Sequence, residues 1–244
     1  MIRVTIWNEF YHERHIESVG KTFPDGMHEH LKRMLACDDF VIRTAWLDKD
    51  EEHGLSEEVL NDTDVLLWWG HARHDAVRDD VVARVVDHVR HGMGFIALHS
   101  AHHSKPFKAL MGTSCSLQWN SYNQKAHVWT VKPTHPIAAG VPLEFTLDQE
   151  EMYGEYFNIP EPDDLIFVTW FKDGHVFRGG CTFTRQAGKI FYFHPGHETC
   201  RSFFNPNVLQ VIRNAIYWAK PIEPKDYRES ECVEPLEDPG CEQE

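Results

Sequence analysis

The sequence predicts an α/β protein with an open, mostly parallel sheet, helices on both faces and an antiparallel extension. Three observations carry this prediction. Short apolar runs alternate with helix-length segments through the first half of the 244-residue chain, which is the rhythm of parallel strands joined by crossover helices. Two of these runs, 65–69 and 95–98, are apolar almost throughout, as strands covered on both faces are. Beyond about residue 112, several strand-like runs follow one another without a helix-length segment between them, which indicates antiparallel strands.

In the first half, the apolar patterns predict four strands and two helices. The strands are expected at 3–7, 40–47, 65–69 and 95–98, and the first helix at 26–35. Six valines at helical spacings predict a second helix over 75–91, and the glycines at 92 and 94 favour its end there.

In the second half, strands are expected at 128–131, 165–171, 176–184 and 189–193. A last amphipathic helix, 207–220, ends before Pro221. No internal repeat or break in composition divides the chain, so we expect one α/β domain over residues 1–222. Residues 223–244 hold nine acidic and two basic side chains and three prolines, a composition that predicts a flexible acidic tail.

Composition excludes several classes of partner. The formal net charge of −14 disfavours nucleic acids and anionic membranes, because their phosphates would be repelled. No run approaches the roughly 20 apolar residues of a membrane span, and the first residues do not resemble a signal peptide, so a cytoplasmic protein is expected. The six cysteines lack CxxC spacing, which predicts reduced thiols. No nucleotide cofactor is expected. The composition is compatible with a homo-oligomer as well as with a monomer.

Histidine is the outlier in composition, with 17 residues. Seven of them follow three expected strands: His71, His74, His99, His102, His103, His194 and His197. Ligands of an open parallel sheet bind beyond the carboxyl ends of its strands, so these side chains are expected at one edge of the sheet. A single histidine in such a place commonly caps a helix or bonds a loop, but the convergence of three clusters favours a functional site.

Neutral imidazoles near helix N-termini can bind a metal or accept a proton. The sequence therefore predicts a divalent metal such as zinc, with ligands drawn from His71, His74, His99 and His102. An acid–base site without a metal is the open alternative.

The fourth strand exit resembles a nucleophile elbow, the sharp turn from strand to helix in which hydrolases place their nucleophile. The residues from Ala97 to Ala101 read ALHSA, so His99 stands where a nucleophilic serine or cysteine would be. Ser100 comes one position late. Catalysis through a serine or cysteine nucleophile is therefore disfavoured.

Carboxylates alternate with aromatic residues over 150–160. Such a segment is a solvated acidic loop or, near a site, a source of acid–base carboxylates and of an aromatic platform for a sugar ring. Glu151 and Tyr153 are accordingly candidates for binding substrate. Four tryptophans are either core residues or stacking surfaces for a sugar: Trp68, Trp69, Trp119 and Trp129. Of these, Trp69 is the candidate for binding substrate.

Several strings in one order give the chain a specific resemblance to a known family. They are WWGH at 68–71, GMG at 92–94 running into LHS at 98–100, LMGT at 110–113, HPI at 135–137, EEMYGE at 150–155, and KIFYF at 189–193 running into PGHE at 195–198. The chain resembles the ThuA-like trehalose-utilisation family of the class I glutamine-amidotransferase-like superfamily, from about residue 4 to residue 219.

The resemblance implies a flavodoxin-like three-layer α/β/α sandwich and a role in disaccharide catabolism. At the motif positions it carries over His71, His74, His99, His102, Glu155, His197 and Glu198. The amidotransferase triad does not carry over, because His99 replaces its cysteine and Glu198 follows His197 directly instead of two residues later.

Together these features predict an enzyme of carbohydrate catabolism that acts on a keto-sugar or keto-disaccharide of the trehalose type. The expected catalytic residues are His99, His197, Glu198 and Glu155, which would move a proton next to a carbonyl in a lyase, hydrolase or isomerase reaction, with or without a metal. The alternative is a sugar-binding or regulatory protein without catalysis on the same scaffold.

Overall fold

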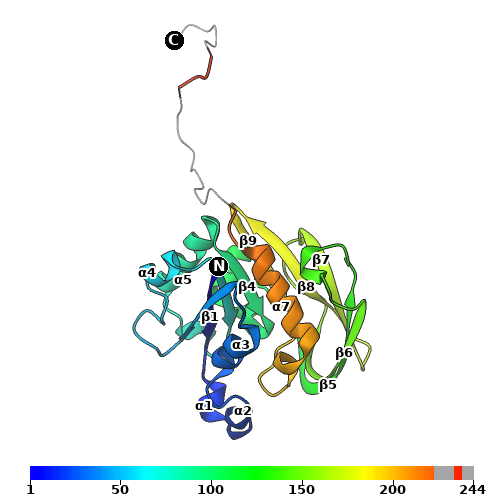
Figure 1. Ribbon diagram of the computed structural model, residues 1–244. Helices are drawn as coiled ribbons and strands as arrows, with labels where there is room; N and C mark the ends of the chain where they lie inside the picture. Colours follow the sequence, from blue (N-terminus) through cyan, green and yellow to red (C-terminus); the bar gives the residue numbers. More distant parts are fainter. Residues whose placement is uncertain (223–233, 238–244) are drawn as a thin grey trace.

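The computed structural model describes residues 1–222 and 234–237 (Figure 1). Its described strands form one nine-stranded sheet in the order β2-β1-β3-β4-β9-β8-β7-β5-β6. The strands are β1 Ile2–Asn8, β2 Phe40–Trp46, β3 Val65–Trp69, β4 Gly94–Leu98, β5 Gln118–Thr130, β6 Glu144–Gly154, β7 Asp164–Phe171, β8 Val176–Arg185 and β9 Gly188–Phe193.

The first five strands in this order, β2 to β9, run parallel, and the remaining four are antiparallel to their neighbours. Every residue of β3 and β4 is buried, as expected for strands covered on both faces. The mostly parallel sheet with an antiparallel extension, predicted from the sequence, is confirmed.

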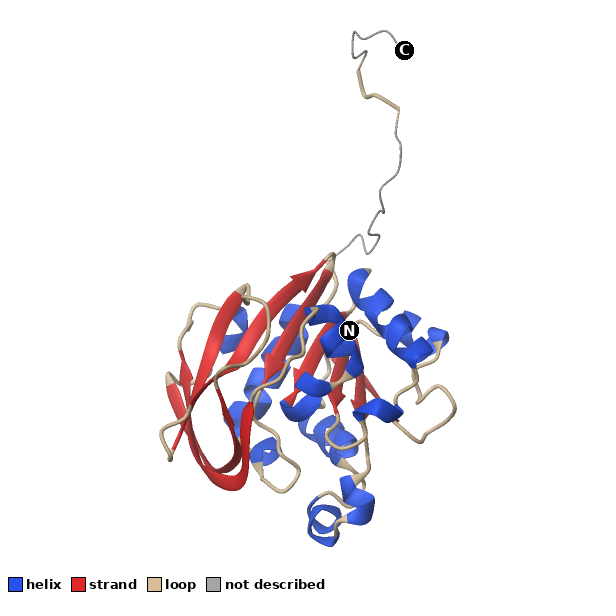
Figure 2. Ribbon diagram, turned by 180° about the vertical axis from the view of Figure 1, so that it is seen from behind, coloured by secondary structure: helices blue, strands red, loops and turns tan. Residues whose placement is uncertain are grey.

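Helices cover both faces of the parallel half (Figures 1 and 2). The α-helices are α1 His12–His15, α2 Glu17–Thr22, α3 Met27–Leu35, α4 Glu57–Asn61, α5 Asp79–Arg90, α6 Lys105–Met111 and α7 Pro206–Ala219. Helices α3 and α7 contact each other and the parallel strands, whereas α4, α5 and α6 form a second contiguous group. Four 3-10 turns complete the elements: η1 His74–Ala76, η2 His99–His103, η3 Pro136–Ala138 and η4 Ser202–Phe204.

Local sequence explains where the helices start and stop. Asn205 accepts hydrogen bonds from two backbone N–H groups at the start of α7, and Pro206 occupies the first helical position. The five buried valines of α5 form the stripe that faces the core. Gly112 ends α6 with φ of 72°, the left-handed conformation that glycine adopts without strain.

Two expected boundaries are wrong, and one strand was not expected. The strand expected at 128–131 is only the end of β5, which starts ten residues earlier, and β6 was not predicted as a strand. Polar and acidic side chains fill most of both segments, so their composition hides the strand pattern that pairing with a neighbour stabilises. The helix expected at 75–91 begins at Asp79, because Arg78 is extended with ψ of 140°.

Other expectations concern the chain ends and the cysteines. The acidic tail expected over 223–244 lies outside the described residues, except for the exposed residues 234–237. Within the described part of the chain, no helix is long and apolar enough to cross a bilayer. The four cysteines in that part, Cys37, Cys115, Cys181 and Cys200, are free thiols.

Candidate functional site

A cavity of about 260 Å³ opens beside the carboxyl ends of β3 and β4. The exits of these two strands supply its histidines, and β5 and β6 supply its opposite wall. The lining residues are His71, His74, Ser100, His102, His103, Trp119, Glu151 and Tyr153. A parallel sheet thus places the site where open α/β sheets bind ligands, and the antiparallel extension completes it.

Three histidines from three strand exits meet next to this cavity. The ring centroids of His71 and His99 are 6.0 Å apart, those of His71 and His197 are 5.3 Å apart, and those of His99 and His197 are 5.2 Å apart. His102 joins them through Tyr153, whose ring centroid lies 5.4 Å from that of His102 and 4.9 Å from that of His99. The structure therefore brings together four of the seven histidines that the sequence placed at one sheet edge.

His99 is fully buried and faces hydrogen-bond acceptors on both ring nitrogens. Its Nδ1 lies 2.8 Å from the carbonyl oxygen of His194, and its Nε2 lies 3.1 Å from Oε2 of Glu151. A carbonyl and a carboxylate only accept, so both nitrogens carry hydrogen. Burial opposes the charge, but the hydrogen bond to Glu151 and the nearby carboxylates raise the pKa of His99 above its usual range, and the side chain is an imidazolium paired with Glu151.

The backbone at His99 has the sharp turn that the sequence suggested. Its φ of 52° lies in the left-handed region, which non-glycine residues adopt uncommonly. Ser100, the next residue, is buried and donates its hydroxyl hydrogen to the carbonyl oxygen of Gly70 at 2.7 Å. The elbow thus presents an imidazolium, and the adjacent serine holds the loop after β3 by its hydrogen bond to Gly70.

Glu198 is a buried carboxylate held between two histidines. Nδ1 of His12 lies 3.0 Å from Oε1 and Nδ1 of His71 lies 3.0 Å from Oε2. Burial opposes ionisation, but these two contacts lower the pKa of Glu198 far below its usual range. The carboxylate stays ionised and is a weak base, which suits it to orient His71.

His102 is a neutral imidazole with a fixed tautomer. Its Nδ1 donates to the carbonyl oxygen of Cys115 at 2.8 Å, so the lone pair lies on Nε2. Burial lowers its pKa well below the usual value, and His103 adds to this effect. Burial also lowers the pKa of His74 to about 3 and that of His197 to about 4, so these rings are neutral near pH 7 as well.

Two buried carboxylates hold the loops that carry the histidines. Glu9 accepts the backbone N–H groups of His71, Ala72 and Arg73 at 2.7, 3.0 and 2.8 Å. Glu150 accepts the backbone N–H groups of Glu151, Gly196 and His197 at 3.0, 2.9 and 3.1 Å, and the hydroxyl of Ser202 at 2.5 Å. Each carboxylate satisfies donors of a loop that would otherwise be buried without partners.

Several predicted site residues lie elsewhere. Both carboxylate oxygens of Glu155 bind Arg178 at 3.0 Å, and Glu155 does not line the histidine cavity. Trp69 is buried and donates from Nε1 to the carbonyl oxygen of Gly196 at 3.0 Å, so it supports the loop after β9. Trp119, another of the tryptophans considered, lines the cavity and is 64% exposed.

The four histidines expected from the sequence as ligands of one metal do not form one group in the structure. His71, His74, His99 and His102 do not offer ligand atoms to one point. The described residues instead form three groups whose potential ligand atoms lie within 4.8 Å of one another: His12, His71 and Glu198; His71, Glu151 and His197; and His99, Glu150 and His194.

Sequence reasoning missed three residues of the site: His12, Glu9 and Glu150. The signal for the first two was present, because Glu9 and His12 follow β1 just as the other histidines follow their strands. The function of Glu150 as a loop anchor depends on residues near 196–202 and has no local signal.

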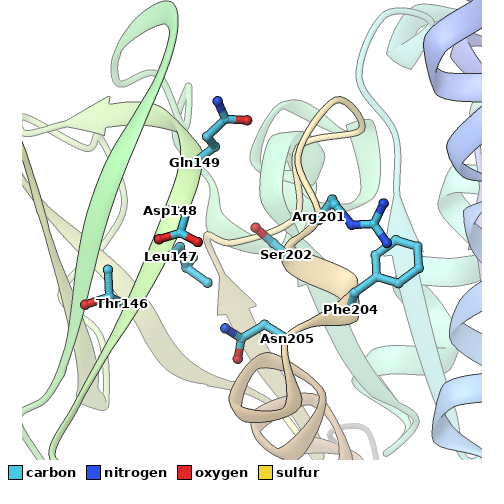
Figure 3. A pocket seen from close by; sticks show the side chains of 8 residues that line it. All are labelled: Thr146, Leu147, Asp148, Gln149, Arg201, Ser202, Phe204 and Asn205. Atoms are coloured by element: carbon cyan, nitrogen blue, oxygen red, sulfur yellow. The ribbon is translucent and has the colours of Figure 1, made fainter.

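A second cavity, of about 370 Å³, lies between β6 and the η4 turn (Figure 3). Its lining residues are Thr146, Leu147, Asp148, Gln149, Arg201, Ser202, Phe204 and Asn205. The guanidinium of Arg201 lies 4.3 Å from the ring centroid of Phe204, and Figure 3 shows it directed away from Asp148. No histidine lines this cavity and its polar groups do not converge, so we place the candidate chemistry in the histidine cavity.

Comparison with solved structures agrees with this fold. A ThuA-like protein from Parabacteroides merdae matches with a TM-score of 0.66 and 15% identity over 89% of each chain. A ThuA-like protein from Bacteroides uniformis matches with a TM-score of 0.64 and 15% identity, over 89% of this chain and 90% of that one. PurLQS from Thermotoga maritima matches with a TM-score of 0.55 and 11% identity, over 89% and 98%. These similarities confirm the flavodoxin-like α/β fold.

Among proteins with curated descriptions, none matches the chain. The model of the ThuA family, described as trehalose utilisation, matches residues 3–219. Because this match spans the sheet, its covering helices and all strand exits of the site, the chain belongs to the ThuA trehalose-utilisation family.

Proposed function

We propose that this protein is an enzyme of carbohydrate catabolism that acts on a keto-sugar or keto-disaccharide by removing the proton next to the carbonyl. One observation carries the proposal. The neutral imidazole of His102 and the phenol of Tyr153, which is joined to the His99–Glu151 pair, line the same cavity. A proton acceptor and a hydrogen-bond donor facing one small space are the two groups that enolisation requires.

His102 is the proposed base in place of the two glutamates expected from the sequence. Its Nε2 carries the lone pair, and no described residue occupies that atom by a hydrogen bond. Glu155 is neutralised by Arg178, and Glu198 is held by His12 and His71. Both carboxylates therefore have their oxygen atoms engaged by a guanidinium or by imidazoles, so neither offers a free lone pair to the cavity.

Tyr153 is the proposed partner of the carbonyl oxygen. Its hydroxyl oxygen lies 3.3 Å from Nε2 of His99, and burial raises its pKa well above the usual value. Nε2 of His99 donates its one hydrogen to Glu151, and the phenol is hydrogen-bonded to the same carboxylate, so Tyr153 would turn its O–H group from Glu151 to the substrate oxygen. The electron pair of the broken C–H bond then moves to that oxygen, while the proton moves to His102.

The enolate formed in this step can react in two ways. It can expel a glycosidic oxygen at the β-carbon, which leaves with a proton as the released sugar. It can instead pass the proton of the hydroxyl on the deprotonated carbon to the enolate oxygen and take back a proton at the former carbonyl carbon, which moves the carbonyl and isomerises the sugar. Either reaction requires a carbonyl, because an unoxidised sugar has no acidified C–H bond.

The shape of the site supports a sugar as the ligand. Trp119 exposes its ring at the cavity and offers a stacking face. A neighbouring cavity of about 390 Å³ shares His74 and His103 with the first, so two joined sugar rings have adjoining spaces. A divalent cation such as zinc, bound among the histidines, would polarise the carbonyl further.

Deuterium exchange tests the proposal without requiring knowledge of the final product. Trehalose oxidised to a ketone in one ring is incubated with the protein in D2O, and NMR follows deuterium entering the carbon next to the carbonyl. We expect exchange with the wild type, at least a 100-fold slower rate with His102→Gln, and unchanged exchange with His91→Gln, a variant of an exposed histidine that lines neither cavity. Binding of the keto-disaccharide without exchange would reject the enzyme and leave the sugar-binding protein.

A further inference from the structure

Three side chains from three separate elements converge next to the proposed substrate cavity. His71 follows β3, Glu151 belongs to β6 and His197 follows β9. One potential ligand atom of each lies within 4.8 Å of the others. His71 is 27% exposed at its side chain, whereas Glu151 and His197 are 7% and 12% exposed, so the group is shielded but can be reached from the cavity.

Each of these side chains has one atom engaged by a neighbour and another atom left for a ligand. Nδ1 of His71 is bonded to Glu198 at 3.0 Å, which leaves its Nε2. Nδ1 of His197 lies 2.8 Å from the hydroxyl of Thr199 and 3.3 Å from the backbone N–H of the same residue, and its Nε2 lies 3.5 Å from Oε2 of Glu198 and 3.9 Å from Oε1 of Glu151. The other oxygen of Glu151, Oε2, is bonded to His99.

This arrangement is that of a metal site with its outer partners in place. Ligating histidines usually donate their second N–H group to a carboxylate or another oxygen, and ligating carboxylates usually accept a further hydrogen bond. Glu198 lies within hydrogen-bond distance of His71, and His99 donates to Glu151. Nδ1 of His197 accepts the backbone N–H of Thr199, and would donate to the hydroxyl of Thr199 once a cation took Nε2. Two imidazoles and one carboxylate with an open position are the ligands of catalytic zinc in hydrolases.

We propose that His71, His197 and Glu151 bind one divalent cation, zinc, with an open coordination position towards the cavity. His71 and Glu151 line that cavity, so a carbonyl or hydroxyl oxygen of a sugar could reach the open position. The site replaces the four-histidine set that the sequence suggested and keeps only His71 of it.

The two other groups fit a cation less well. In the group of His99, Glu150 and His194 all members are buried, and Glu150 already accepts four hydrogen bonds. In the group of His12, His71 and Glu198, the carboxylate contacts both imidazoles directly at 3.0 Å, so a cation would have to displace both contacts.

The role of the zinc ion rests on the proposed function, in which zinc would polarise the carbonyl of the substrate. The existence of the zinc site does not rest on it. Binding itself is measured without substrate. A protein that binds zinc at these residues but leaves the keto-disaccharide unexchanged would therefore refute the proposed function and support the metal site.

The test uses the full-length chain without a histidine tag, stripped with a chelator and titrated with zinc chloride by calorimetry. We expect one zinc per chain, binding at least tenfold weaker in His197→Gln and Glu151→Gln, and binding unchanged in His12→Gln and His74→Gln. His12→Gln removes a histidine from the competing group, and His74→Gln removes one from the same cavity. Circular dichroism and the thermal midpoint of each variant show whether it is folded.

NMR of the wild-type histidine rings gives a second readout that does not depend on the folding of any variant. Zinc should shift the ring resonances of His71 and His197 most strongly. Absence of stoichiometric zinc, zinc binding that survives both ligand variants when folded, or loss of zinc in His12→Gln would overturn the proposal. The last result would assign the cation to His12, His71 and Glu198.

Discussion

Nε2 of His99 lies 3.1 Å from Oε2 of Glu151, and these two buried side chains form an ion pair at the turn after β4. The pair joins the strand exit on the parallel side of the sheet to β6 on the antiparallel side. It also gives the elbow position a positive charge, where enzymes with the same turn hold a nucleophile. The turn has the backbone geometry of a nucleophile elbow but carries an imidazolium in place of a nucleophile.

We expect His99→Asn to destabilise the protein by about 3 kcal/mol, because it leaves the buried carboxylate of Glu151 without its cation. Asparagine tolerates the left-handed backbone of this turn, so the change tests the charge rather than the backbone. Urea unfolding of the single variants and of His99→Asn/Glu151→Gln measures the effect. The double variant should lose less stability than the sum of the two, and additive losses would show that the pair contributes no coupling.

We expect Trp119→Ala to raise KM for the keto-disaccharide about tenfold and to leave kcat nearly unchanged, because stacking contributes to binding before and during the reaction alike. Trp129→Ala is the matched control, since Trp129 is also exposed on β5 but does not line the cavity. Steady-state kinetics of both variants with the keto-disaccharide measures KM and kcat. Equal effects of the two would remove Trp119 from the binding site.

We expect Glu9→Gln to lower the free energy of unfolding by about 2 kcal/mol, because an amide cannot replace a charged carboxylate that accepts three backbone N–H groups. Hydrogen exchange at residues 71–73 should speed up at the same time. Glu161→Gln, a change at an exposed carboxylate, should stay within about 0.5 kcal/mol. Unchanged exchange at 71–73 would contradict the proposed anchoring of this loop.

We expect stability to fall as the pH drops below about 6.5, where an unfolded histidine becomes protonated. Burial lowers the pKa of His28 to about 4, and its Nδ1 accepts a hydrogen bond from Asn8 at 3.0 Å. The unfolded chain therefore binds this proton first, so stability is full above pH 6.5 and is lost towards pH 4. His28 alone should account for about 2 kcal/mol between pH 7.5 and pH 5.

Urea unfolding at these two pH values tests this expectation. His28→Gln should reduce the difference between them, because glutamine does not titrate there. His91→Gln, a change at an exposed histidine, should leave the difference as in the wild type. The same pH dependence in His28→Gln would assign the acid sensitivity to other buried histidines.

We expect no release of ammonia from glutamine above the background rate, because the elbow holds a paired imidazolium rather than a thiolate. A coupled ammonia assay with the wild type and His99→Ala measures this. Release that requires His99 would show that the interpretation of the elbow is wrong.

The sequence alone determined the parallel half of the fold and the edge where the site lies. Continuous apolar runs such as 65–69 and 95–98 are local patterns, and their exits follow directly from the order of the chain. The family resemblance came from strings around the same exits. The parallel strands and their exits can be predicted without knowledge of tertiary contacts, because a buried parallel strand is apolar along its whole length.

The tertiary structure decided which residues meet and in which state of charge. Glu151 reaches His99 only because β6 joins the far side of the sheet, and Glu155, four residues later, is turned to Arg178 instead. Protonation depends on burial and on partners far along the chain, so no spacing rule separates the cationic His99 from the neutral His102. A strand such as β6 is stabilised by pairing rather than by its own composition, which is why the sequence pattern did not predict it.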